Sequence, residues 1–414
     1  MPHGFSLAYG AQSVSFSCGP GADFYTVQDP VKKANVQRFA QALSAFMTNA
    51  DLDLAQPAVV VADKTRLCGY PLYLPVLVEN LVAHGARPEA ISLCIAYGTH
   101  LPQSDAVSEK SYGPCFGQYR WVHHQCEGDH FKELGTTPGG TPVRIRADLA
   151  EASCVITFGA VSHHYFAGYG GGRKLLFPGL GHKDAIYANH GLFLDPGTRA
   201  LTSGCRPGQL EGNPLAQDLE DYESFFSADM AIHGILNSHG EVCDLLVGKG
   251  RDHFRKACAL HAASCEIDVG KQYDLVIASC GGFPKDINFI QSHKTIHHAA
   301  DWVRDGGRLI VLSECRDGIG SQTFLPWFEL GGWDAAFDAL ARNYVGNGGT
   351  ALAMMNKTRR IKISLVTALQ PSLAEMIGVE CVSAEHVQTI INRHDGEMAV
   401  IPNGGMLVKK PKKT

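Results

Sequence analysis

Short apolar runs alternate with segments of helical spacing along most of the chain, and this alternation is the strongest constraint on its fold. Residues 57–62 (Pro-Ala-Val-Val-Val-Ala) form a run typical of a buried strand, and residues 72–83 then show helical spacing before a turn at His84-Gly85. Parallel strands need a crossover connection, usually a helix, and buried parallel strands are continuously apolar. The pattern therefore predicts an α/β fold with largely parallel sheets wrapped by helices.

The same pattern continues to the end of the chain. Further strands are expected at 90–97, 152–159, 273–279 and 308–313, with helices at 252–263 and 384–391 and a closing strand and turn at 400–404. A chain of 414 residues is too long for one ordinary domain. We expect two α/β domains with the active site in the cleft between them: an N-terminal domain over 1–265, a C-terminal domain over 270–400, and a C-terminal strand and basic tail over 401–414.

Composition excludes several classes of protein. The chain is 45% hydrophobic and 19% charged, which is typical of a globular protein. Its net charge of -5 gives no electrostatic basis for binding nucleic acid. No apolar run reaches the ~20 residues of a membrane helix, so no membrane partner is expected. Thirteen scattered cysteines without a CxxC pair, and no secretory signal pattern at the start, favour free thiols in a reducing cytoplasm.

Residues 162–190 carry the densest chemistry in the sequence. They contain His164, a glycine cluster that includes Gly171 and Gly172, then Lys174 and His190. An imidazole can carry a proton near neutral pH or bind a borderline-soft metal, and a desolvated lysine amine can be acylated. Glycines alone indicate only a turn, but three reactive side chains together point to an active site.

Polar residues also follow several of the predicted strands. Asp63-Lys64-Thr65-Arg66 follows the first, Gly98-Thr99-His100 the second, and His163-His164 the third. In open parallel sheets, ligands bind beyond the carboxyl ends of the strands. These groups are therefore expected at one edge of one sheet, while Gln291 and Lys294 follow a strand of a second sheet.

These elements together resemble the nickel-dependent lactate racemase family. The resemblance rests on Asp63-x-Thr65-Arg66, Gly98-Thr99-His100, His164 followed ten residues later by Lys174 in Gly-Gly-Arg-Lys, His190, and Gln291-x-x-Lys294. Their order and spacing are specific, and the match extends over most of the chain.

The resemblance implies an organometallic cofactor, the nickel-pincer nucleotide, which is a nickel complex of pyridinium-3,5-bisthiocarboxylic acid mononucleotide. It implies that Lys174 holds this nucleotide through a thioamide and that His190 is the protein ligand to nickel, with Asp63, Thr65, Gly171 and Gly172 in the cofactor site. Two sulfurs and one ring carbon of the cofactor supply the other nickel ligands, and square-planar geometry suits Ni(II). Proteins of cofactor biosynthesis are then expected as partners.

The activity implied is inversion at C2 of a 2-hydroxy acid, by transfer of hydride to the cofactor and back. His100 and His164 are then two opposed general bases. Arg66 and Lys294 would hold the substrate carboxylate and the developing oxygen charge, with Gln291 orienting it. Asp63 is expected to anchor the nucleotide or Arg66.

One departure from the family pattern concerns the substrate. The family's lactate enzymes carry tyrosine just before the glutamine of Gln-x-x-Lys, where this chain has Ile290. Loss of that hydroxyl reshapes the pocket, so a 2-hydroxy acid other than lactate is expected. Two other functions stay open: a zinc-type metallohydrolase that uses His100, His164 and His190 as ligands, and a carrier that holds the nucleotide without turnover.

The remaining histidines are interpreted as structural. His293 and His297 have i, i+4 spacing on a predicted helix, with His298 beside them, but an i, i+4 pair alone is a weak metal signal. We expect this pair on a partly exposed helix face. His123 and His124 follow Trp121-Val122 on a predicted strand.

Overall fold

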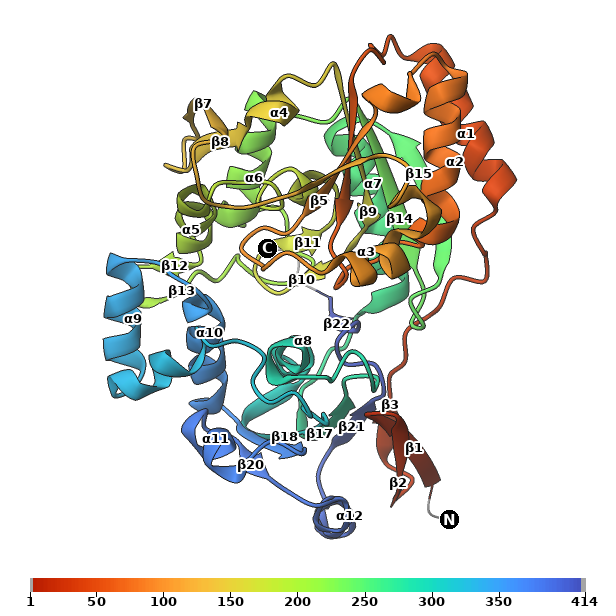
Figure 1. The fold of residues 1–414 in the computed structure, drawn as a ribbon. Coiled ribbons are helices and arrows are strands. Elements are labelled where there is room, and N and C mark those ends of the chain that lie inside the picture. The colour runs from red at the N-terminus through yellow and green to blue at the C-terminus, as the bar shows by residue number, and fades with distance from the viewer. Residues whose placement is uncertain (1–2, 411–414) are drawn as a thin grey trace. The chain divides into compact units, whose positions relative to one another are not determined.

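The computed structural model describes residues 3–410, which divide into two compact units. One unit, here called the anchor unit, comprises residues 29–193 and 203–264; the other, the closing unit, comprises residues 3–28, 194–202 and 265–410. Figure 1 shows the helices and strands of each unit. The predicted α/β class with largely parallel sheets is confirmed, since each unit is built on a six-stranded sheet.

The anchor unit has the strand order β15-β14-β9-β4-β5-β6, in which only β15 is antiparallel to its neighbour. Its sheet strands are β4 (Pro57–Ala62), β5 (Ser92–Ala96), β6 (Arg120–His123), β9 (Cys154–Ala160), β14 (Met230–Leu236) and β15 (Val242–Gly248). Two hairpins are added, β7 (Phe131–Thr136) with β8 (Pro142–Arg146) and β10 (Ser162–His164) with β11 (Gly168–Gly170). Its helices are α1 (Val36–Asn49), α2 (Tyr70–Ala83), α3 (Asp105–Tyr112), α4 (Ala147–Ala150), α5 (Lys183–Gly191), α6 (Pro214–Phe225) and α7 (Gly250–Cys265), with short 3-10 turns η1 (Pro88–Ala90), η2 (Gly113–Cys115) and η3 (Gly172–Leu175).

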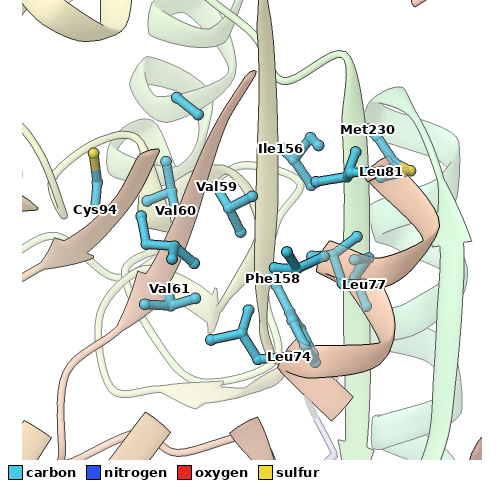
Figure 2. Packing of buried hydrophobic residues seen from close by; sticks show 14 of the residues in the cluster. Val59, Val60, Val61, Leu74, Leu77, Leu81, Cys94, Ile156, Phe158 and Met230 are labelled. Carbon is cyan, nitrogen blue, oxygen red and sulfur yellow. The ribbon is translucent and has the colours of Figure 1, made fainter. Parts of the chain in front are cut away.

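The core of the anchor unit forms because β4 is buried along its whole length. Figure 2 shows Leu77 and Leu81 of α2 directed toward Ile156 and Phe158 of β9, while Val60 lies on the other side of the sheet. Side chains alternate between faces along a strand, so Gly159 faces away from α2, and there a Cβ would lie 2.9 Å from Leu175 of η3. The loop that carries Lys174 is therefore packed directly on the sheet.

The closing unit has an all-parallel sheet in the order β20-β19-β18-β17-β21-β3. Its strands are β1 (His3–Tyr9), β2 (Gln12–Cys18), β3 (Ala22–Phe24), β12 (Leu194–Asp195), β13 (Ala200–Leu201), β16 (Glu266–Ile267), β17 (Tyr273–Ser279), β18 (Val303–Leu312), β19 (Lys362–Val366), β20 (Glu380–Cys381), β21 (Met398–Ile401) and β22 (Val408–Lys409). Its helices are α8 (Phe289–Ala300), α9 (Trp333–Arg342), α10 (Gly348–Thr358), α11 (Pro371–Met376) and α12 (Ala384–Arg393), with the 3-10 helix η4 (Leu325–Leu330). Alternate residues of β17 pack against α8 on one face and against the β1–β2 hairpin and α12 on the other.

The units are not the contiguous domains predicted as 1–265 and 270–400. Residues 3–28 belong to the closing unit, because β3 pairs with β21 and the β1–β2 hairpin covers that sheet. Residues 194–202 join it as well. The strand and turn predicted at 400–404 are present, as β21 and the turn after it, but the short strand β22 follows them. In the predicted basic tail, Lys409 lies in β22, while residues 411–414 lie outside the described residues.

The expected exposure of the histidine helix is wrong. His293 is 2% exposed and His297 is 7% exposed, because α8 packs between the sheet and α10. Burial lowers the pKa of His293 to about 3, and the charge of Lys357 adds to the effect. A buried neutral imidazole is consistent with a structural residue.

Two further expectations concern thiols and membranes. All thirteen cysteines are free, and all but Cys126 and Cys381 are buried, as expected for small apolar residues. None of the helices within residues 3–410 combines the length and apolar character that a membrane crossing requires.

Candidate active site

Asp63 and His100 meet at the carboxyl edge of the anchor sheet. Ala62 and Ala96 are paired at the ends of β4 and β5, so the turns that follow these strands are neighbours. The Nδ1 atom of His100 lies 2.8 Å from Oδ2 of Asp63. The other carboxylate oxygen accepts from the backbone N–H of Thr65 at 2.9 Å and from its hydroxyl at 2.6 Å. Both oxygens of a buried carboxylate are thus engaged.

Of the two roles expected for Asp63, anchoring the nucleotide or Arg66, its side chain forms no hydrogen bond to Arg66. It binds His100, whereas Arg66 is exposed and donates to the Thr65 hydroxyl at 3.4 Å. Burial alone would raise the pKa of the Asp63 carboxyl, but the hydrogen bond from His100 and the charge of Arg66 outweigh it. The pKa lies below its ordinary value, so Asp63 is ionised at neutral pH.

The hydrogen bonds assign opposite tautomers to the two predicted bases. An ionised carboxylate only accepts, so Nδ1 of His100 donates and the lone pair of the neutral ring is on Nε2. In His164 the Nδ1 atom accepts from the backbone N–H of Ala167 at 3.3 Å, which places the proton of the neutral ring on Nε2. In the neutral rings, Nε2 of His100 is therefore the basic nitrogen, whereas Nε2 of His164 carries the proton.

The ring of Phe166 brings three of the predicted residues together. The centroid of the Phe166 ring lies 4.6 Å from the ring centroid of His164 and 4.9 Å from the ring centroid of His190. The Nζ atom of Lys174 lies 5.8 Å from the Phe166 centroid. These residues come from the β10–β11 hairpin, from α5 and from η3. Phe166 is itself 2% exposed. A single buried ring thus fixes the spacing of a proton carrier, an amine and an imidazole.

The glycines predicted for the cofactor site are required by the backbone. Gly171 has φ +80°, and a Cβ there would lie 2.3 Å from the Ala160 carbonyl oxygen. Gly172 has φ +52°, and its Cβ would lie 2.5 Å from the Phe254 ring. Non-glycine residues rarely adopt such angles. The two glycines let η3 turn tightly against the sheet and present Lys174.

Two backbone hydrogen bonds link the turn of His100 to that of Lys174. The N–H of Gly98 donates to the Gly179 carbonyl at 2.8 Å, and the N–H of Gly179 donates to the Lys174 carbonyl at 2.9 Å. The residues that follow β5 and those that follow β11 are thereby held side by side.

Lys174 and His190 are both favoured in their neutral forms. Burial lowers the pKa of the Lys174 amine well below its ordinary value, and the charges of Arg66 and Arg173 lower it further. Burial also lowers the pKa of His190 to about 3, with the charge of Lys174 adding to the effect. A neutral amine is nucleophilic and a neutral imidazole is a metal ligand.

Gln291 and Lys294 belong to the closing unit. They stand in the first two turns of α8, where Nζ of Lys294 donates to Oε1 of Gln291 at 2.7 Å. Asn288 caps this helix by accepting from the Gln291 N–H. Ile290 is half-buried and packs on the core of the closing unit.

Comparison with known sequences shows the family. The lactate racemase N-terminal domain matches residues 9–200, and the lactate racemase C-terminal domain matches residues 269–335. Together they cover more than half of the chain, which therefore belongs to the lactate racemase family, as predicted.

Two curated relatives and two solved structures are similar. The lactate racemase of Thermoanaerobacterium thermosaccharolyticum is 26% identical over 273 residues, 66% of this chain, and that of Lactiplantibacillus plantarum is 26% identical over 278 residues, 64% of this chain. The chain spans only 62% of the length of each relative. The lactate racemase apoprotein structure from T. thermosaccharolyticum superposes with a TM-score of 0.86 at 21% identity, covering 99% of this chain and all of that one. A Thermotoga maritima crystal structure gives 0.69 at 16% identity, covering 93% of this chain and all of that one. At these identities the structures establish the fold.

Sequence reasoning missed Phe166 and the pairing of Asp63 with His100. The pairing had a signal, because both residues follow strands whose ends were predicted to lie at one edge of the same sheet. For Phe166 the sequence carried only a weak signal: it is an aromatic residue two positions after His164 and two positions before a glycine. Its contact with His190 depends on the packing of α5, which no local pattern encodes.

Asp63→Asn is expected to destabilise the protein at neutral pH by about 1–3 kcal/mol, since it removes a buried charge that accepts hydrogen bonds. The pKa of Asp63 is lower in the folded state than the unfolded value of about 3.9, so its contribution is complete above about pH 4 and is lost as the pH falls toward the folded-state pKa. The difference from wild type in urea unfolding should therefore shrink in acid. Asp51→Asn, at an exposed position, is the control. Equal stability of Asp63→Asn and wild type at pH 7 would contradict this assignment.

Proposed function

We propose that this chain is a racemase or epimerase that inverts C2 of a 2-hydroxy acid with a nickel-pincer nucleotide. The observation that carries the proposal is the convergence of His164, Lys174 and His190 on the Phe166 ring. Membership in the lactate racemase family and the relatives named lactate racemase support it. The relatives support isomerisation of a 2-hydroxy acid. The nickel-pincer cofactor and the identity of the acid go beyond them and are part of the proposal.

The residues present fit the cofactor. Lys174 offers a neutral amine, the form that thioamide attachment requires, and His190 offers a neutral imidazole on the same aromatic ring. Among the described residues, no group of three or more His, Cys, Asp or Glu side chains is positioned to hold a metal. A metal that brings three of its own ligands needs only one histidine, whereas the zinc-type hydrolase alternative needs a protein ligand set. When bound, the group would supply an acceptor for the hydrogen at C2.

The histidines of the chain carry the proton transfers in this proposal. Nε2 of His100, with Asp63 holding Nδ1, takes the proton of the substrate hydroxyl. His164, in its protonated form, returns a proton to the oxygen on the opposite face and is left as the neutral ring. For the other enantiomer the two exchange roles. Asp63 is a positioning residue, since it orients His100 and stabilises its protonated form.

Arg66 would bind the substrate carboxylate from the anchor unit. A role for Gln291 and Lys294 in binding the substrate is proposed from their positions in the family pattern.

The side chain of Ile290 is an argument against lactate as the substrate. In place of the tyrosine hydroxyl of the family's lactate enzymes it offers an apolar side chain, which favours 2-hydroxy acids with a larger substituent. A nucleotide carrier without turnover is the other candidate, but the presence of both His100 and His164 favours a catalyst, because a carrier has no use for two proton-transfer groups.

Lys174→Ala should abolish covalent attachment of the nucleotide. The measurement is the intact mass of protein purified from a host able to make the cofactor. Wild type should carry added mass on the peptide that contains Lys174, and His190→Ala should retain that mass but lose nickel more readily. The same added mass on Lys174→Ala would remove Lys174 as the anchor.

His100→Ala and His164→Ala should each slow racemisation in both directions by about 10²–10⁴-fold, the usual contribution of a general acid–base group. Each turnover needs one residue to accept and the other to donate, so neither direction should be spared. Chiral chromatography of each pure enantiomer measures the rates. His84→Ala is the control, since His84 is the C-cap of α2, at the end of the helix away from the carboxyl edge of the sheet. A variant that keeps the wild-type rate in one direction would show that its histidine is not a base in this reaction.

A further inference from the structure

A pocket opens at the amino ends of the strands of the anchor sheet. Its volume is about 290 Å³, and it is lined by Gln56, Ser92 and Arg120, which lie where three neighbouring strands begin. Asp63 and His100 follow the carboxyl ends of two of these strands. Strand β4 has six residues that rise about 3.3 Å each, so the pocket and the candidate active site are roughly 20 Å apart.

Small side chains leave this space open. Ala58, Ala90 and Ala152 line the pocket together with Cys94, and Leu149 closes it on one side. Figure 2 shows Cys94 on the side of the sheet away from α2. Ala58, Cys94 and Leu149 are each 2% exposed, so the floor is apolar and well shielded. An apolar part of a ligand would be desolvated there.

The charges at the mouth are unbalanced. Arg146 binds both oxygens of Asp148, at 3.0 and 2.8 Å, and Arg87 lies 3.9 Å from Glu89. Within residues 3–410, Arg120 forms no ion pair with a carboxylate, and the side chains of Ser92 and Gln56 form no hydrogen bond. One guanidinium, one hydroxyl and one amide therefore remain to bind a ligand.

We propose that this pocket binds a small organic monocarboxylate with an apolar body, separately from the racemase site. Guanidinium groups bind carboxylates through two parallel hydrogen bonds, and the hydroxyl of Ser92 supplies a further donor. A single uncompensated positive charge matches a monoanion. A phosphate dianion would add a second negative charge near Glu89 and Asp148.

Binding of benzoate, benzamide and phenyl phosphate by isothermal titration calorimetry tests the proposal. Benzoate should bind the wild-type chain saturably and more tightly than either other probe. Arg120→Gln should weaken benzoate at least about tenfold, as expected for loss of a charge-assisted pair. Ala152→Leu, which fills the wall without changing charge, should weaken it as well. Arg38→Gln, at an exposed arginine of α1, is the matched charge control and should bind as wild type does.

Arg66→Gln separates this pocket from the proposed racemase site, and benzoate binding should survive it. Loss of binding in Arg66→Gln with retention in Arg120→Gln would place the anion in the racemase site and overturn the inference. Absence of saturable benzoate binding, or equal affinity in Arg120→Gln and wild type, would overturn it too. Tighter binding of phenyl phosphate than of benzoate would overturn the choice of a carboxylate. Circular dichroism confirms that each variant is folded, and a failure of racemase activity would leave these results unaffected.

Discussion

The packing of Phe166 against His164, Lys174 and His190 is the contact on which the chemistry of the anchor unit depends. The ring holds a proton carrier, an amine and an imidazole at fixed spacings although they come from three separate elements. Lys174 and His190 are also buried, and this desolvation is the largest cause of their lowered pKa values. The site thus combines fixed spacings with neutral forms of the amine and of His190.

Phe166 can serve this role because the backbone around it is fixed on several sides. Asn213 donates to the Phe166 carbonyl at 2.9 Å, and the N–H of Gly208 donates to the Gly168 carbonyl at 3.0 Å. A Cβ on Gly168 would lie 2.3 Å from the Gln209 carbonyl oxygen, so only glycine permits this approach. The hairpin is thereby held against the loop before α6, and the carboxyl edge of the sheet supplies Asp63 and His100 beside it.

The parallel core and the positions of the polar clusters could be predicted because they depend on local pattern. The run at β4 is apolar throughout, β17 was predicted with its observed bounds, and Asp63 and His100 were expected at one edge of the same sheet. Long-range packing had no such signal. The assignment of residues 3–28 to the closing unit depends on the pairing of β3 with β21, some 370 residues apart in sequence, and the burial of His293 depends on α10.

The arrangement around Phe166 can be measured without cofactor or substrate. In apoprotein labelled selectively at phenylalanine and histidine, nuclear Overhauser effects should connect the ring protons of Phe166 with the imidazole protons of both His164 and His190. His164→Gln and His190→Gln assign the two sets of signals. Detection of both contacts in the folded wild-type protein is the predicted result. Their absence, with the Phe166 ring signals resolved and assigned, would contradict the claim that this ring organises the site.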